Sequence, residues 1–261
     1  MNVAAFFDLD GTLVPPPSLE KRFLRYLRWR GALRWKNFAR CAAPLLRETS
    51  RAIFAGEWNS LECATAQCKA YFAGVPAAAL DAWLGWLARR PVELIPEALR
   101  RIEWHARQGH RIFLLSGTLR PLAEAVVRLF PVPVAVRATQ LESEGGHYTG
   151  RVRGDAVCGL AKARAMERLA AEYLLDLDRS YAYGDSFADR WMLARAGHPF
   201  VIQAEGHFSR RLAWLARRRG WPILRWSADQ QEERQIQRRD AECAENRREK
   251  RNIMTAQVKS R

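Results

Sequence analysis

The sequence lacks any long hydrophobic run free of charges. Its longest uncharged stretch extends only from Ala70 to Leu80. A membrane-spanning helix needs roughly 20 consecutive apolar residues, so the sequence predicts no spanning helix. The first strand is expected directly after Met1 and Asn2, which leaves no room for a secretory signal peptide. We therefore expect a cytoplasmic protein.

Cysteine and histidine are also scarce, with five of each among 261 residues. An odd number of cysteines does not match a disulfide framework, and their spacing matches no zinc site. The histidines are scattered and indicate no metal cluster. We expect reduced thiols at the cysteines, which are residues 41, 63, 68, 158 and 243.

Acidic residues are outnumbered by basic ones, 28 against 43, for a net charge of +15. Residues 18–56 carry ten Lys or Arg against Glu20 and Glu48, a net charge of +8. Such a charge would favour nucleic acid, a phospholipid surface or an anionic substrate. Beyond Trp226 the composition changes: residues 229–261 have no aromatic residue and nine Lys or Arg against seven Asp or Glu. We expect a charged tail at 228–261, either helical or disordered.

Predicted strands and helices alternate along most of the chain. This alternation indicates an α/β fold with a parallel sheet that is covered by helices on both faces. Residues 17–90 show helical patterning only, and a polar hairpin is expected around 144–147. The strands are expected at 3–8, 111–115, 133–136, 180–184 and 199–203. The helices are expected at 97–109, 119–130, 159–174, 187–196 and 208–219.

Four polar motifs follow in order near predicted strand ends or helix starts. Asp8 and Asp10 follow the apolar run that starts at Val3, and Ser116-Gly117-Thr118 follows the strand at 111–115. Lys162 lies at the start of the helix at 159–174, and Asp185 and Asp189 follow the strand at 180–184. Because open α/β sheets bind ligands at the carboxyl ends of their strands, we expect these side chains to converge.

The order Asp-x-Asp, Ser, Lys, Gly-Asp-x-x-x-Asp resembles the haloacid dehalogenase superfamily, and within it the phosphoserine-phosphatase-like branch, subfamily IB. The resemblance covers about residues 3 to 225. It implies a Rossmann-like parallel sheet with an α-helical cap inserted after the first strand. The catalytic core would comprise residues 1–16 and 91–227, and the cap residues 17–90.

The resemblance also implies a phosphatase that hydrolyses a phosphate monoester through an aspartyl phosphate. Asp8 would be the nucleophile and Asp10 the general acid and base, with Lys162 as a third catalytic residue. Ser116, Gly117 and Lys162 would bind the phosphate. Magnesium would be held by Asp8, Asp10, Asp185 and Asp189.

The chemistry itself explains why the pattern contains so many carboxylates. An aspartate can attack phosphorus and form an acyl phosphate, which splits a difficult hydrolysis into two easier steps. The nucleophile must stay ionised while it faces an anionic phosphate, and a divalent cation relieves this repulsion. Mg²⁺ prefers oxygen ligands and binds through one or two carboxylates plus phosphate. Asp8 and Asp185 are the first carboxylates that we assign to it.

The substrate remains open between a phosphoserine-like compound and a phospholipid headgroup phosphate. Recognition of phosphoserine would need a cap carboxylate for the amine, and Glu20 is the nearest candidate. Residues 20–30 combine aromatic side chains with arginines. They predict an amphipathic helix that packs inside the cap or, alternatively, one that makes peripheral contact with an anionic membrane.

Two other functions stay open. The chain could be a basic membrane- or nucleic-acid-binding relative with little activity, although the sequence carries no strong nucleic-acid signal. It could also be a phosphotransferase that uses the same aspartate.

Overall fold

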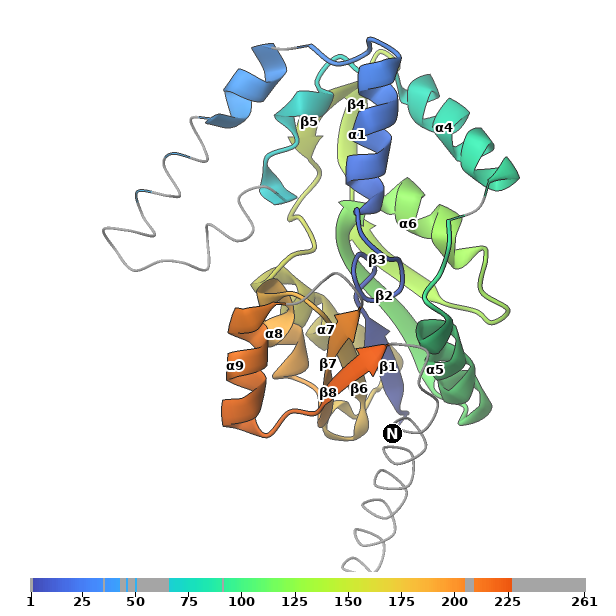
Figure 1. Cartoon of the computed structure of the whole chain (residues 1–261), viewed down its shortest axis with the longest axis vertical. Coiled ribbons are helices and arrows are strands. Elements are labelled where there is room, and N and C mark those ends of the chain that lie inside the picture. The colour runs from blue at the N-terminus through green and yellow to red at the C-terminus, as the bar shows by residue number, and fades with distance from the viewer. Residues whose placement is uncertain are drawn as a thin grey trace, which may run out of the picture. The chain divides into compact units, whose positions relative to one another are not determined.

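Six parallel strands form the central sheet of the protein, in the order β3-β2-β1-β6-β7-β8 (Figure 1). In this computed structural model the described residues are 2–34, 36–42, 46, 50, 66–90, 92–204 and 209–226. The strands are β1 (Ala4–Phe7), β2 (Arg111–Leu119), β3 (Ala135–Thr139), β6 (Tyr181–Gly184), β7 (His198–Ala204) and β8 (Ile223–Trp226). The expected α/β fold with a parallel sheet is confirmed.

Helices cover both faces of this sheet. Alternate residues of β1 point to opposite sides, and the two sides contact different helices. Phe6 belongs to a core cluster with side chains of α7, α8 and α9, whereas Phe7 stacks on Tyr183 and meets His105 of α5 edge-on. Both faces of β1 are therefore apolar, as in a strand buried on both sides. The helices are α5 (Pro96–Arg107), α6 (Arg120–Val127), α7 (Leu160–Tyr173), α8 (Arg190–Leu193) and α9 (Arg210–Arg219).

The described part of the segment after β1 is mostly helical. It contains α1 (Leu19–Trp29), the 3-10 helix η1 (Ala70–Phe72) and α4 (Ala77–Arg89). The hairpin of β4 (Leu141–Glu144) and β5 (His147–Val152) joins them, because its backbone bonds to the chain just before α4 (Figure 1). No described helix is both long and apolar enough to cross a bilayer.

The aromatic side of α1 faces inward. Phe23 lies with its ring centroid 5.7 Å from that of Phe72 and 5.3 Å from that of Trp83, and Leu27 is fully buried. The prediction that residues 20–30 form an amphipathic helix packed on its neighbours is confirmed for these residues. Trp29 is the exception, with 79% of its surface exposed.

The chain divides into two compact units, Met1–Trp226 and Ser227–Arg261. The expected tail at 228–261 lies outside the described residues. The division of the first unit into a core at 1–16 and 91–227 and a cap at 17–90 stays a prediction.

Two local expectations were wrong. β2 continues to Leu119 instead of ending at 115, so Ser116-Gly117-Thr118 belongs to the strand, which changes its register with β3 between Ser116 and Leu119. β8 was not predicted. Its apolar residues Ile223 and Leu224 are followed by Arg225, and so short a run does not show the alternation of apolar and polar residues that identifies a strand.

The expectation of reduced thiols is wrong for one pair of cysteines. Cys41 and Cys68 form a disulfide, with their Cα atoms 5.9 Å apart, whereas Cys158 keeps its thiol. The two partners are 27 residues apart in the sequence. Their pairing is a tertiary contact, and their spacing alone carries no such signal.

A buried cluster of aromatic and basic side chains lies between α5 and the sheet. His105 hydrogen-bonds through Nε2 to the Tyr183 hydroxyl and through Nδ1 to Nδ1 of His110, both at 2.8 Å. Burial lowers the pKa of His105 well below its usual value, and the nearby His110, Arg101 and His198 lower it further. The imidazole of His105 is therefore neutral in the folded protein at neutral pH.

We predict that this neutral histidine makes stability depend on pH. The unfolded chain takes up a proton at His105 below about pH 6.5, whereas the folded protein resists it. The contribution of the neutral His105 to the free energy of unfolding is thus fully present above about pH 6.5. Below that pH the free energy of unfolding decreases, by up to about 1.4 kcal/mol per pH unit. Denaturant unfolding between about pH 5 and pH 7 should show a shallower slope for His105→Gln. His147→Gln, on the exposed hairpin, is the control and should keep the wild-type slope. Equal slopes for His105→Gln and the wild type would contradict the assignment.

Candidate active site

The loop after β1 places two carboxylates at the carboxyl end of the sheet. The Asp8 amide donates to the Tyr183 carbonyl at 2.9 Å, so Asp8 still pairs with the neighbouring strand. The chain then turns at Gly11, whose φ is +89°. A Cβ at Gly11 would come within 2.3 Å of Oδ2 of Asp185. Glycine is therefore required for both the backbone conformation and the close approach of Asp185.

The loop after β6 supplies the other two carboxylates. Oγ1 of Thr12 donates to Oδ1 of Asp185 at 2.8 Å. The backbone amide and Oγ of Ser186 donate to Oδ2 of Asp189 at 3.0 and 2.6 Å. Thr12 and Ser186 thus orient carboxylates.

Lys162 joins the two loops. It lies in the first turn of α7 and is buried, and its Nζ is 2.6 Å from Oδ1 of Asp8 and 2.5 Å from Oδ1 of Asp189. Burial alone would lower the pKa of Lys162, but the carboxylates of Asp189 and Asp8 outweigh it and raise the pKa. The ammonium therefore stays charged throughout the physiological pH range.

The carboxylates outnumber this single cation. Burial raises the pKa of Asp8 well above its usual value, Lys162 opposes the rise, and Asp189 and Asp185 add to it. Oxygen atoms of Asp8, Asp185 and Asp189 all lie within 4.8 Å of one another. Three buried carboxylates around one lysine leave an excess of negative charge, and oxygen donors of this kind suit Mg²⁺. The residues present therefore fit a bound divalent cation.

Asp10 is held differently. Its Oδ1 accepts a hydrogen bond from the backbone amide of Leu19 at 2.8 Å, which ties the loop to the start of α1. Burial raises the pKa of Asp10, while the hydrogen bonds from Leu19 and Thr118 lower it in part. Its side chain is not among the three that cluster for a cation, so any part of Asp10 in metal binding stays a prediction.

A pocket of about 510 Å³ opens over these groups. Ser116 and Gly117 of β2 line it together with Asp8, Asp10 and Lys162. All four predicted motifs thus contribute to this region, since Asp189 contacts Lys162. Thr118 also lines the pocket, and its amide donates to Oγ of Ser116 at 3.1 Å.

One part of this pocket was only partly anticipated. Glu20 of α1 was considered as a candidate for binding an amine, but it is paired with Lys69, with which it forms a buried salt bridge. The two residues are 49 positions apart, and no local pattern in the sequence links them.

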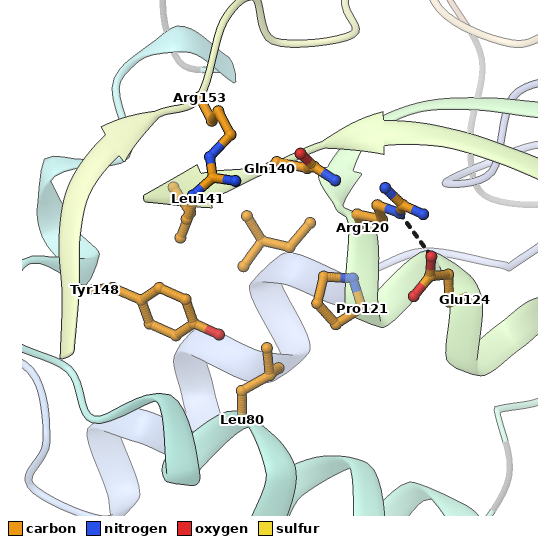
Figure 2. A pocket seen from close by; sticks show the side chains of 9 residues that line it. Leu80, Arg120, Pro121, Glu124, Gln140, Leu141, Tyr148 and Arg153 are labelled. Carbon is orange, nitrogen blue, oxygen red and sulfur yellow. Dashed lines mark hydrogen bonds and ion pairs between the residues drawn. The ribbon is translucent and has the colours of Figure 1, made fainter. Parts of the chain in front are cut away.

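A second pocket, of about 250 Å³, lies between α4, the start of α6 and the hairpin (Figure 2). Arg120 pairs there with Glu124 at 2.6 Å, while Leu80 and Tyr148 lie on the opposite side. Among the described residues, the linings of the two pockets do not overlap. Of these two pockets, the first is the one lined by Asp8 of the carboxylate cluster.

Comparison with known proteins agrees with this geometry. The sequence pattern of the family described as haloacid dehalogenase-like hydrolase matches residues 5–194. A protein of Mycobacterium tuberculosis that is named as a phosphoserine phosphatase is 30% identical over 230 residues, which cover 85% of this chain and 70% of that protein.

Solved structures show the same fold. A protein of unknown function from Bordetella pertussis Tohama I superposes with a TM-score of 0.62 at 26% identity, over 87% of this chain and 99% of that one. A phosphoserine phosphatase solved as an analogue of its phospho-aspartyl intermediate gives a TM-score of 0.58 at 18% identity, over 88% of this chain and 96% of that one. The second likeness concerns the fold alone.

The resemblance seen in the four motifs is thereby confirmed. The chain belongs to the haloacid dehalogenase-like hydrolase family, and it is a phosphatase similar to the phosphoserine phosphatases.

Proposed function

We propose that the protein hydrolyses a small phosphate monoester through an aspartyl phosphate on Asp8, with Mg²⁺ as its cofactor. The observation that carries the proposal is the buried cluster of Asp8, Asp185 and Asp189, bridged by Lys162 and open to a pocket. An ordinary surface ion pair, by contrast, would not be buried and would not contain more carboxylates than cations.

Asp8 is the nucleophile in this proposal. One of its carboxylate oxygens attacks phosphorus, the bond from phosphorus to the leaving oxygen breaks, and an acyl phosphate forms on Asp8. Lys162 lies 2.6 Å from Oδ1 of Asp8 and offers a fixed positive charge to the phosphoryl oxygens. Ser116 and the amide of Gly117 line the pocket beside Asp8 and are placed to donate hydrogen bonds to the same oxygens.

Asp10 is the general acid and base. Its raised pKa favours the protonated form that can donate to the leaving alkoxide. Once it has lost that proton, the carboxylate can accept one from the water that attacks the acyl phosphate. Water is the acceptor of the phosphoryl group in this proposal, which separates it from a phosphotransferase.

Asp8 and Asp185 would hold the magnesium ion, with Asp189 supporting them through Lys162 and Ser186 and the Asp10 carbonyl as a further ligand. When bound there, Mg²⁺ neutralises charge on the nucleophile and the phosphate and polarises the phosphoryl oxygens.

The basic face of α1 contributes at longer range. Arg25, Arg28 and Arg30 are exposed, while the apolar side of the helix is buried. Exposed positive charge near the pocket raises the local concentration of an anionic substrate. We favour this role over contact with an anionic membrane. Two of the basic residues counted in residues 18–56, those at 47 and 51, lie outside the described residues.

Replacing the nucleophile should remove the reaction pathway. We expect Asp8→Asn to fold and to lose turnover of an aryl phosphate by roughly 10³ or more, because no acyl phosphate can form. Mass spectrometry after a rapid acid quench should find phosphate on the wild type and none on the variant. Asp81→Asn, at an exposed position of α4, is the control and should keep full activity. Wild-type turnover by Asp8→Asn would remove Asp8 as the nucleophile.

The role of Asp10 predicts a dependence on the leaving group. An aryl alcohol leaves without much protonation, whereas an alkyl alcohol needs the acid. We expect Asp10→Asn to lose about 10² to 10⁴ more activity with alkyl phosphates than with aryl phosphates, as is typical of general acid catalysis. Steady-state rates on a matched pair of esters would measure this. Equal losses on both esters would contradict the assignment.

Removal of the cation should abolish turnover and lower the stability of the folded protein. We expect a chelator to abolish turnover and Mg²⁺ to restore it, with Ca²⁺ a poor substitute because it favours more ligands at longer distances. Mg²⁺ should also raise the melting temperature of the wild type, since a ligand of the folded state stabilises it. Asp185→Asn should lose that increase. Full activity after exhaustive chelation would exclude the metal from the reaction.

A further inference from the structure

A buried ion pair lies on the cap side of the catalytic pocket. Nζ of Lys69 is 2.7 Å from Oε1 and 2.6 Å from Oε2 of Glu20. The hydroxyl of Tyr71 also donates to Oε1 of Glu20. Only 9% of Glu20 and 3% of Lys69 are exposed, although both line the pocket. Both oxygens of the cap carboxylate are therefore already engaged by groups of the chain itself.

This pair lies next to the leaving-group side of the reaction. Glu20 directly follows Leu19, whose amide donates to Asp10 at 2.8 Å. Glu20 is also close enough to Asp10 to raise the pKa of Asp10. Because Asp10 delivers a proton to the leaving oxygen in the proposed reaction, the alcohol part of the substrate lies in the same pocket that Glu20 and Lys69 line.

The charge of this part of the pocket is not negative. Apart from the catalytic groups, its charged described lining residues are Glu20, Lys21 and Lys69, a net of one positive charge. A substrate ammonium that approached Glu20 would meet Lys69 beside it. Like charges at such short range in a buried site repel strongly, and Glu20 cannot exchange Lys69 for the substrate without leaving a buried ammonium unpaired. The uncharged lining residues on the cap side include Leu24, Phe38, Cys41, Ala66 and Cys68.

We propose that Glu20, Lys69 and Tyr71 form a specificity set that selects phosphate monoesters whose alcohol carries no ammonium group. This inference rests on the proposed phosphatase function and narrows its substrate class. It separates this chain from an enzyme for phosphoserine, the compound in the names of several relatives. The three residues act by charge: Lys69 neutralises the one cap carboxylate in the described part of the pocket that could bind an amine.

The test compares two esters that differ by one group. Phosphoserine and 3-(phosphonooxy)propanoate share the phosphate, the chain length and the carboxylate, and only phosphoserine carries the ammonium. We expect the wild type, with Mg²⁺, to show a kcat/KM at least tenfold higher for 3-(phosphonooxy)propanoate. A wild type that prefers phosphoserine would overturn the proposal.

Variants test whether Lys69 causes the preference. Lys69→Gln keeps a hydrogen-bond donor for Glu20 but removes the positive charge, and it should reduce the preference or reverse it in favour of phosphoserine. Lys36→Gln is the matched control, because it removes a positive charge from an exposed residue that does not line the pocket. It should keep the wild-type preference. An unchanged preference in a folded Lys69→Gln would overturn the assignment.

Should Lys69→Gln melt too early for assay, the double variant Glu20→Gln/Lys69→Gln removes both charges and leaves no unpaired buried ion. It is expected to lose most of the discrimination, and a wild-type preference in this variant would overturn the assignment equally.

A binding measurement separates this inference from the proposed function. Calorimetry on Asp8→Asn with Mg²⁺ and each intact ester reads recognition without turnover. Weaker binding of phosphoserine than of its deaminated counterpart supports the specificity set, even if the wild type hydrolyses neither ester and the phosphatase proposal fails. Tighter binding of phosphoserine overturns the specificity set, even if the wild type is an active phosphatase.

Discussion

One buried ammonium holds the site together. Lys162 bridges a carboxylate after β1 and a carboxylate after β6, at 2.6 and 2.5 Å. Without it, two negative charges would be buried near a third, that of Asp185. An uncompensated buried charge is strongly destabilising, so the approach of the two strand-end loops depends on α7 placing Lys162 between them. The same excess of negative charge that the lysine only partly balances makes the site suitable for a divalent cation.

The sheet order explains why the motifs could be predicted from the sequence. β1 lies between β2 and β6, and all three are parallel. Polar residues at the carboxyl ends of adjacent parallel strands must lie close together, however far apart they are in the sequence. The convergence of Asp8 and Asp185 therefore follows from strand prediction, whereas Ser116 lies within β2, which continues to Leu119. Lys162 needed the family resemblance, because a lysine in the first turn of a helix is otherwise ordinary.

The contacts of the described helices that follow β1 were much less predictable. Helical patterning was correct for α1 and α4, but it gives no information on which helical residues meet across the pocket. Glu20 pairs with Lys69, and Cys41 with Cys68, over separations of 49 and 27 residues. Neither strand register nor a repeated spacing fixes such pairs, since helices pack in many relative orientations. Residues at strand ends can therefore be predicted to converge, whereas pairs between helices depend on tertiary contacts that the sequence does not reveal.

The central position of β1 also has a consequence for biosynthesis. This strand leaves the ribosome before its partners, which begin at residues 111 and 181, and the bond between Thr12 and Asp185 spans 173 positions. Parallel pairing over such separations raises contact order and slows folding. A nascent chain that ends before β6 therefore carries β1, apolar on both faces, with one edge still open to unwanted pairing. The carboxylate cluster is complete only after β6 and the residues that follow it have been made, so a polypeptide truncated before them lacks both Asp185 and Asp189.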